Sequence, residues 1–245
     1  MRRNYLGTAG KNGIWGGIDL KVNAILPMKG NSERVPGKNM RLFAGRPLYH
    51  MIAGVLQDIP IVDTIIINTD SKQIADDAVK NFSKVKIHIR PDKIRGDMVS
   101  MNEIIAYDIK YVDKGDFFLQ THSTNPLLSK KTLEKALNNF FSQQDKYDSL
   151  FSVTPLQSRL YWADGRAVNH NPNELLRTQD LEPIFEENSN FYIFSRQSFL
   201  EAGNKRIGLR AGMFIVDKRE AIDIDEEDDF QLAEYIYRMN NLYLR

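Results

Sequence analysis

The 245-residue chain contains no cysteine and only four histidines. The absence of cysteine excludes disulfide bonds, thiolate metal sites and a cysteine nucleophile. No stretch approaches the roughly 18 consecutive apolar residues that a membrane-spanning helix needs. The first residues begin with Arg2 and Arg3 but are not followed by the apolar core of a signal peptide. We therefore expect a cytoplasmic protein that does not enter a membrane.

The chain also lacks an excess of charge of either sign, because 33 basic residues face 32 acidic ones and the formal net charge is +1. Proteins that bind nucleic acid or anionic membranes usually carry a basic excess, so we expect neither partner. This length suits one α/β domain that buries a substantial core. Residues 1–20 hold five glycines and little periodicity. We predict a poorly ordered leader there and a single domain over 21–245.

Apolar runs and amphipathic runs alternate along most of the chain. Predicted strands lie at 22–26, 64–68, 85–89, 117–119, 149–153, 191–194 and 213–216. Predicted helices lie at 46–58, 71–80, 101–112, 129–141 and 227–239. This alternation predicts a three-layer α/β/α fold with a mainly parallel sheet. Residues 155–187 interrupt it with turn residues and a predicted β-hairpin at 161–168, and such a long excursion is usually functional or interfacial.

The first candidate site is the stretch AILPMKGNSERVPGKN, residues 24–39. A buried strand that opens into a loop rich in glycine and lysine is a common way to build a phosphate site at the carboxyl edge of a sheet. Lys29, Arg34 and Lys38 bring three positive charges, which suit a triphosphate. The loop is not a P-loop, because six residues separate its two glycines, and no G-x-G-x-x-G follows the strand. An ordinary basic surface loop is the alternative.

The second candidate site is the run AIDID at residues 221–225. Two residues apart in an extended segment, Asp223 and Asp225 point to the same face. Carboxylates placed in this way can bind a hard divalent cation together with phosphate oxygens, Mg²⁺ first and Mn²⁺ second. Capping of the following helix explains the acids from Asp225 to Asp229 but leaves Asp223 without a role.

Both runs resemble motifs of the cytidylyltransferases that activate sialic acids and related 3-deoxy-2-keto sugar acids. The loop resembles the family's opening motif P-A-R-x-x-S-x-R-x-P-x-K-N, on which six residues fall without a gap: Pro27, Ser32, Arg34, Pro36, Lys38 and Asn39. Lys29 stands at the family's arginine position, which keeps the charge but loses the forked geometry. Residues 222–230 resemble the family's I-D-I-D-x-x-x-D-F element.

A third block, residues 177–193, resembles the family's R-x-Q-D-L-P…E-N-G-A-I-Y-I stretch, which lines the sugar-acid site. The resemblance implies that Arg177, Gln179 and Asn188 contact the sugar, with the first two on one face if the segment is extended. Without the resemblance, Arg177 would be taken for a surface arginine. Bulkier residues stand at 189–191 where the family has Gly-Ala-Ile, so we expect a narrower pocket.

Base recognition has two candidates. In the family's L-Q-P-T-S-P-L loop, a glutamine four residues before proline contacts the base. Counting back from Pro126 gives His122, which ungapped spacing favours, while Gln120 lies two residues earlier. Arg90 resembles the family's R-P-x-x-L element near the nucleotide.

The resemblance implies a fold like that of the nucleotide-diphospho-sugar transferases. It also implies transfer of CMP from CTP to the anomeric hydroxyl of a 2-keto-3-deoxy sugar acid, with release of pyrophosphate. The residues expected around the nucleotide are Lys29, Ser32, Arg34, Lys38, Asn39, Arg90, and His122 or Gln120. Those expected in the catalytic step are Lys29, Arg34, Lys38 and Asp225.

The resemblance further implies a homodimer formed through the excursion at 155–187. Two alternatives remain. A hexose-1-phosphate nucleotidyltransferase would need the G-G-x-G-T/S-R loop, which is missing. A non-catalytic sugar-nucleotide-binding protein would be favoured by loss of Lys38 or of either aspartate, and all three are present.

Overall fold

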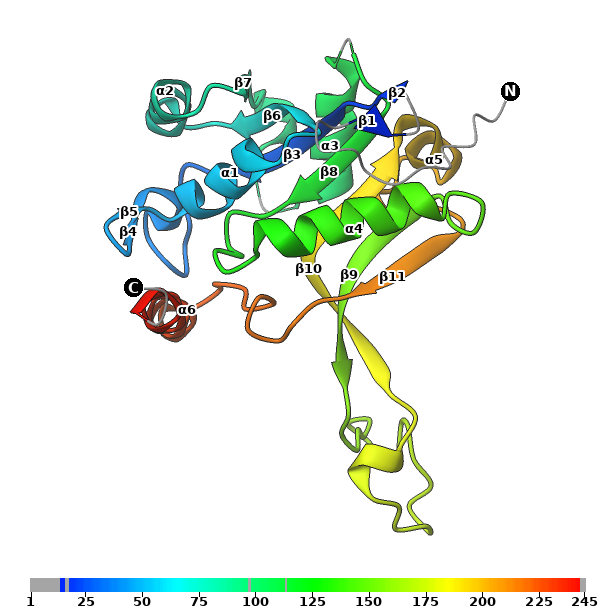
Figure 1. Ribbon diagram of the computed structural model, residues 1–245. Helices are drawn as coiled ribbons and strands as arrows, with labels where there is room; N and C mark the ends of the chain where they lie inside the picture. The colour runs from blue at the N-terminus through cyan, green and yellow to red at the C-terminus, as the bar shows by residue number, and fades with distance from the viewer. Residues whose placement is uncertain (1–13, 16–17, 97, 113, 243–245) are drawn as a thin grey trace.

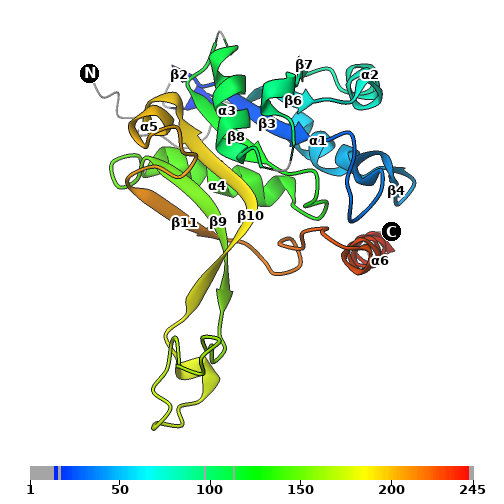
Figure 2. The ribbon, with the colours of Figure 1, turned by 180° about the vertical axis from the view of Figure 1, so that it is seen from behind.

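The computed structural model describes residues 14–15, 18–96, 98–112 and 114–242. Its centre is a seven-stranded mixed sheet in the order β11-β9-β10-β8-β3-β6-β7 (Figures 1 and 2). The strands are β3 Val22–Met28, β6 Val62–Thr69, β7 Val85–Ile89, β8 Phe117–Thr121, β9 Ser149–Leu156, β10 Ile184–Ser195 and β11 Ala211–Ile215. Strands β8, β3, β6 and β7 are mutually parallel, and β10 runs antiparallel to both β8 and β9. The predicted α/β class with a mainly parallel sheet is confirmed.

Helices cover both faces of the sheet. They are α1 Tyr49–Asp58, α2 Lys72–Asn81, α3 Met101–Lys110, α4 Lys130–Ser142, α5 Arg196–Glu201 and α6 Glu227–Leu242. Successive residues of β3 point to opposite faces, so Ala24 and Leu26 pack in the core that holds α1, α2 and α4. Ile25 packs on the other side with α3 and α5. The sheet therefore lies between two helical layers, which is the predicted three-layer arrangement.

Local sequence explains where the helices begin. The hydroxyls of Ser71 and Ser129 accept from backbone N–H groups three residues later, as N-caps do, at 3.3 and 3.2 Å. Ser100 and Glu103 form a reciprocal capping box at the start of α3. Only the predicted start of α1 differs. Residues 46–47 form β5 (Arg46–Pro47), which pairs with β4 (Leu42–Phe43) across a tight turn.

The last helix joins the body of the fold through the β4–β5 corner. Phe230 of α6 packs edge-on against Phe43 of β4, with ring centroids 5.6 Å apart. Arg41 donates two hydrogen bonds to the carboxylate of Glu227 at the start of α6. These contacts bring the segment before α6 to the carboxyl edge of the sheet, where the loop after β3 also lies.

Strands β9 and β10 continue beyond the sheet and carry a projecting arm, residues 157–183, drawn below the body in Figure 1. The predicted hairpin is present as a bridge between Tyr161 and Ala167. Its turn holds Gly165 at φ 85°, a conformation that glycine adopts without strain. The arm exposes large apolar side chains, among them Trp162 at 57% and Leu175 at 92%.

The predicted leader, residues 1–20, lies largely outside the described residues. Within it, β1 (Ile14–Trp15) and β2 (Ile18–Asp19) pair antiparallel. No described helix combines the length and the apolar character needed to cross a membrane.

Candidate active site

The loop after β3 has a fixed shape. The N–H of Gly30 donates to Asp70 at 2.7 Å, which ties the loop to the end of β6. A Cβ on Gly30 would lie only 2.9 Å from the Cβ of Ser71, so the close approach requires glycine. Gly37 takes a left-handed conformation at φ 63° and starts the short 3₁₀ turn η1, Lys38–Met40.

Asn39 closes this loop from inside. Its amide donates to the carbonyl of Lys29 at 2.8 Å and accepts from the hydroxyl of Ser123 at 2.6 Å. The Asn39 side chain thus joins both ends of the loop to the chain after β8. Ser32 is half-buried, while Lys29 and Arg34 are exposed.

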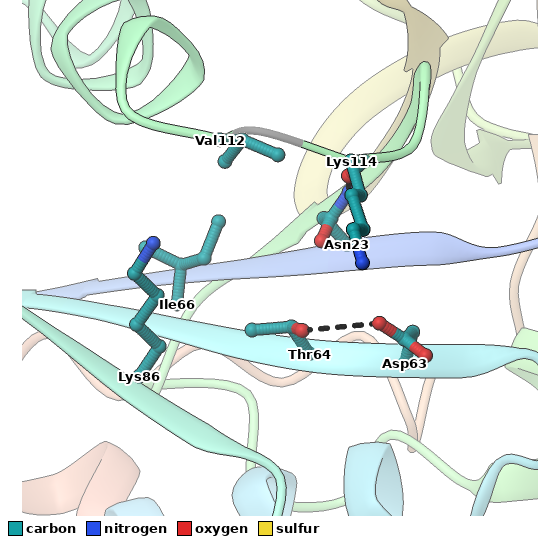
Figure 3. A pocket seen from close by; sticks show the side chains of 7 residues that line it. All are labelled: Asn23, Asp63, Thr64, Ile66, Lys86, Val112 and Lys114. Atoms are coloured by element: carbon teal, nitrogen blue, oxygen red, sulfur yellow. Dashed lines mark hydrogen bonds between the residues drawn. The ribbon is translucent and has the colours of Figure 1, made fainter.

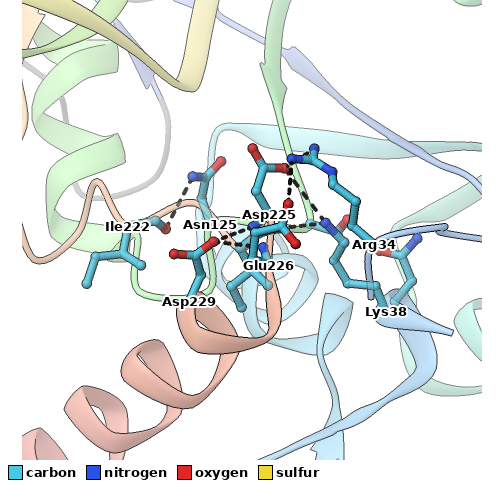
Figure 4. A network of polar contacts seen from close by, with 10 residues as sticks. Arg34, Lys38, Asn125, Ile222, Asp225, Glu226 and Asp229 are labelled. Carbon is cyan, nitrogen blue, oxygen red and sulfur yellow. Dashed lines mark hydrogen bonds and ion pairs between the residues drawn. The ribbon is translucent and has the colours of Figure 1, made fainter. Parts of the chain in front are cut away.

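Two of the three loop cations, Arg34 and Lys38, meet the segment before α6 (Figure 4). Arg34 donates to Asp225 at 2.6 Å, and this charge raises the pKa of the arginine. The amine of Lys38 donates to the carbonyl of Ile224 at 2.5 Å and lies 4.0 Å from the carboxylate of Asp225. Lys38 is only 8% exposed, and this burial lowers its pKa, against the charge of Asp225.

Asp223 and Asp225 line one cavity of about 480 Å³. Desolvation by the surrounding protein raises the pKa of Asp223, and a hydrogen bond with the Thr124 hydroxyl opposes this shift. The side chain nevertheless stays accessible from the cavity. Capping of α6 falls to Asp229, which accepts from the N–H groups of Asp225 and Glu226 at 3.0 and 2.8 Å. Asp223 therefore stands free of the capping role.

In the described part of the chain, no three metal-binding side chains of the histidine or carboxylate kind gather at one point. A divalent ion at Asp223 and Asp225 would need its remaining ligands from phosphate or water, which is how Mg²⁺ is usually held beside nucleotides. The two carboxylates fit such an ion, because the charge of Asp225 contributes to the raised pKa of Asp223 and a bound cation would offset that repulsion.

The rest of the cavity lies between the ends of β9 and β10 and the segment before α6. Its other lining residues are Thr154, Leu156, Glu186, Glu187, Asn188, Ser189, Lys218, Ala221 and Ile222. Asn188, predicted to contact the sugar, lines the cavity, and its amide donates to Thr154 at 2.8 Å. Ser189 has φ 56°, a left-handed conformation that a serine side chain seldom adopts, at the position where a glycine was expected.

Arg177 and Gln179 are not brought to this cavity within one chain. They lie on the arm, where Arg177 donates to Asp180 at 2.7 and 3.1 Å with its side chain 73% exposed. Residues 178–180 form the 3₁₀ turn η3 (Thr178–Asp180), so the extended segment assumed for these two residues is wrong. Asp180 satisfies the guanidinium locally, which favours the turn.

The two candidates for base recognition lie together at the end of β8, Gln120 within the strand and His122 just after it. Gln120 is fully buried and accepts from Arg206 at 2.7 Å, while its amide lies 3.0 Å from both the carbonyl of Thr121 and Nε2 of His122. Because Arg206 can only donate, the Gln120 amide donates to His122, whose proton is then on Nδ1. Burial and the charge of Arg206 lower the pKa of His122 to about 3. The amide groups of Gln120 are used in hydrogen bonds within the protein, whereas neutral His122 keeps the N–H group at Nδ1 for a ligand.

Arg90 is buried and anchored. It donates through Nε to the side chain of Asn68 at 2.7 Å and through Nη2 to its carbonyl at 3.1 Å. Asn68 in turn donates to Asp108, which also lies 2.8 Å from His88. The predicted nucleotide-binding role of Arg90 therefore depends on a guanidinium that is already fixed between β6 and β7.

A second hollow of about 170 Å³ lies near the ends of the strands at which β3 and β6 begin (Figure 3). Lys86 and Lys114 border it beside Asp63 and Thr64 at the start of β6. Ligands of open parallel sheets bind at the carboxyl ends of strands, and none of the predicted site residues lies here. The candidate site lies at the other end of the strands.

A cationic loop after the first strand of a parallel sheet, closed against two carboxylates, defines a nucleotide-binding α/β enzyme. The chain belongs to the cytidylyltransferase family, whose model matches residues 23–244. It is accordingly a nucleotidyltransferase. It is 29% identical over 236 residues to the CMP-N,N'-diacetyllegionaminic acid synthase of Legionella pneumophila, covering 90% of this chain and 98% of that protein. It is 25% identical over 232 residues to the pseudaminic acid cytidylyltransferase of Campylobacter jejuni, covering 91% and 98%.

Solved structures give the same fold. CMP:2-keto-3-deoxy-manno-octonic acid synthetase complexed with CTP superposes with a TM-score of 0.65 at 11% identity, covering 90% of this chain and 99% of that one. The predicted likeness to nucleotide-sugar transferases is confirmed at the level of the fold.

Motif reasoning missed two residues that the structure brings to the site. Arg206 lies in no motif, and it reaches Gln120 only because β10 pairs with β8 so that Tyr192 faces Gln120. Lys218 lines the cavity from the loop after β11. Neither carries a local signal in the sequence.

Proposed function

We propose that the protein transfers CMP from CTP to the anomeric hydroxyl of a 2-keto-3-deoxy sugar acid of the nonulosonate class and releases pyrophosphate. One observation carries the proposal. The cationic loop reaches the aspartates: Arg34 and Lys38 pair with Asp225, and Asp225 lines one cavity together with Asp223. A triphosphate and a sugar acid need this pairing of cations and metal-binding carboxylates.

Asp223 and Asp225 would hold Mg²⁺, or Mn²⁺ in its place. When bound, such an ion neutralises developing phosphate charge and lowers the pKa of an attacking hydroxyl. Arg34 now occupies Asp225 at 2.6 Å, so binding of the triphosphate would draw this arginine to phosphate and leave the carboxylate to the ion.

The remaining residues position the reactants. Lys29, Arg34 and Lys38 neutralise the triphosphate, Ser32 and Asn39 shape its loop, and Arg90 stands beside the nucleotide. The sugar hydroxyl attacks the α-phosphorus in line, the bond to the β-phosphate breaks, and pyrophosphate leaves. Positioning and fixed charge supply most of the rate in such transfers.

Base recognition is assigned to His122 rather than Gln120. The Gln120 amide is already taken up by Thr121, His122 and Arg206. With Nε2 accepting from Gln120, the Nδ1–H of His122 can donate to an acceptor on cytosine.

The nonulosonate class is supported by the similar proteins named for legionaminic and pseudaminic acids and by Ser189 on the cavity wall. We expect N-acetylneuraminate to be a poorer substrate than a modified nonulosonate, since the Ser189 side chain stands on the cavity wall. Asn190 and Phe191 are buried in the fold and do not line the cavity, so the expectation that they narrow it is wrong. A cytoplasmic location is part of the proposal, because CTP is a cytoplasmic metabolite.

The arm supports a homodimer. Its exposed apolar residues have no cover on their own body, and Arg177 and Gln179 can reach a sugar acid only in the cavity of a second subunit. Within one subunit they bind nothing but the arm itself.

The test is pyrophosphate release with each nucleoside triphosphate against a panel of acids: N-acetylneuraminate, a legionaminate, a pseudaminate and an octulosonate. We expect CTP with a nonulosonate to be fastest, chelation to abolish the activity and Mg²⁺ to restore it. UTP with a hexose-1-phosphate as the preferred pair would establish the alternative nucleotidyltransferase. No turnover with any pair would favour a non-catalytic binding protein.

The aspartates provide a sharper test. Asp223→Asn and Asp225→Asn should each lower kcat by about 100-fold or more, because fixed charge at the reacting phosphate is lost. Asp228→Asn is the matched control, since this exposed acid of the same run does not line the cavity. Near-normal rates in both aspartate variants would remove the metal assignment.

A further inference from the structure

Arg206 is held in place from three elements. It lies in the loop between α5 and β11, and its N–H donates to Asn102 at the start of α3 at 3.2 Å. Its guanidinium donates to Gln120 of β8 at 2.7 Å and lies 3.6 Å over the ring of Tyr192 of β10. An arginine stacked on an aromatic ring with one edge fixed is preorganised to receive a planar anion.

The carboxylate of Glu187 acts on the charge of Arg206 from a distance, without forming an ion pair. Among the described residues, Arg206 forms no ion pair, although Arg34, Arg41 and Arg177 each do so. Burial lowers its pKa, but a guanidinium stays charged at any physiological pH. It carries more N–H donors than Gln120 and Tyr192 can accept. A half-buried cation in this state is costly unless it serves a ligand.

Its position links the two halves of the site. The hydroxyl of Tyr192 donates to Glu187 and lies 3.1 Å from that of Ser189, and both of those residues line the cavity of Asp223. Arg206 also bonds Gln120, whose amide donates to His122. The guanidinium therefore contacts one residue that bonds the proposed base reader and one that bonds the wall of the cavity.

We propose that Arg206 receives the carboxylate of the sugar acid, an inference that rests on the proposed function. In a 2-keto-3-deoxy acid the carboxylate is attached to the carbon that carries the reacting hydroxyl. A group that fixes it must stand near the place where nucleotide and sugar meet, and Arg206 is separated from the cavity wall by the single side chain of Tyr192. A bidentate pair would orient the hydroxyl as well as bind the acid. Lys218, the cation in the cavity wall, is exposed and offers only a point charge.

The experiment compares each sugar acid with its methyl ester, which lacks the negative charge. The wild-type enzyme should prefer the acid strongly. Arg206→Ala should raise the KM for the acid by about 10- to 100-fold, the range of a charged hydrogen bond, leave the KM for CTP nearly unchanged and erase the preference over the ester. Added guanidinium ion should restore part of the preference, which a purely structural role would not allow.

Arg210→Ala is the matched control, because this arginine of the same loop donates to the carbonyl of Asp145 away from the site. Arg206→Lys keeps the charge without the fork and should show intermediate discrimination, also if the alanine variant folds poorly. Unaltered acid preference in both Arg206 variants would overturn the inference, as would its loss in Lys218→Ala or Arg177→Ala instead. These outcomes need an active wild-type enzyme, so they are distinct from failure of CMP transfer itself.

Discussion

His122 shows how a neighbouring residue sets the chemistry of a side chain. Gln120 and Arg206 fix its tautomer, and burial with the charge of Arg206 keeps the ring neutral by lowering its pKa from 6.5 to about 3. A neutral imidazole can donate a hydrogen bond to the edge of a base without adding a positive charge that attracts phosphate. The residue type follows from sequence, but its protonation state depends on a partner 84 residues away in the chain, Arg206.

We predict that His122 makes the fold sensitive to acid. Below pH 6.5 the unfolded chain takes up a proton that the folded chain refuses, so stability falls as pH drops from 6.5 toward 3. Because the ring is partly exposed, we expect about 1 kcal/mol of this loss between pH 7 and pH 5. Urea unfolding at both pH values should show it in the wild type and not in His122→Gln.

His170→Gln provides the control, since that ring faces only Asn169 and Tyr161 on the arm. An equal loss of stability in wild type and His122→Gln would mean that His122 is not the group excluded from protonation.

At residue scale, the motifs named side chains that the structure brings together. Arg34 and Lys38 lie against Asp225, and Asp223 lines the same cavity as Asp225, while their roles in catalysis stay a prediction. Arg206 could not be predicted, because its contacts are set by strand pairing and not by a local pattern. Arg177 was named from a motif that carries no information on how far the arm projects.

At the scale of elements, Lys38 joins the loop after β3 to the segment that starts α6. Its amine donates to the carbonyl of Ile224 between the two aspartates. Arg41 and Phe43 hold α6 on the same side of the fold. The loop after β3 and the candidate metal ligands therefore cannot move independently.

We predict that Lys38→Ala weakens CTP binding by about 10-fold or more and lowers kcat, because a shielded cation is lost opposite the triphosphate. Titration of the protein with CTP and steady-state kinetics would measure both effects. Lys72→Ala, at a side chain 86% exposed on α2, is the control. Unchanged CTP titration in Lys38→Ala would mean that this loop does not hold the triphosphate.

The direction of β10 was less predictable than the positions of the helices. Helix starts follow from Ser71, Ser100 and Ser129, whose capping acts within a few residues. Parallel neighbours need a crossover, usually helical, and residues 157–183 contain no α-helix. That absence is the one sequence feature that favours the antiparallel pairing of β9 and β10.

At the scale of the molecule, the arm is the part whose large apolar side chains are left exposed within one subunit. We predict that it mediates dimer formation and that Leu175→Asp or Trp162→Lys weakens association, since each places a charge in an apolar contact. Sedimentation velocity over a range of concentrations would measure this. Leu200→Asp, at a leucine 60% exposed on α5, is the control. A wild-type protein that stays monomeric at every concentration would contradict the prediction.

Strand β10 lies between β8 and β9, although the chain makes it after both. Phe191 pairs with Thr121, so the middle of the sheet closes only once the chain has been synthesised 70 positions beyond Thr121. Contacts of such long range slow folding. Until β10 arrives, β8 and β9 present unpaired edges on which other chains can add. The yield of folded protein during synthesis will therefore depend on how quickly the ribosome passes the arm.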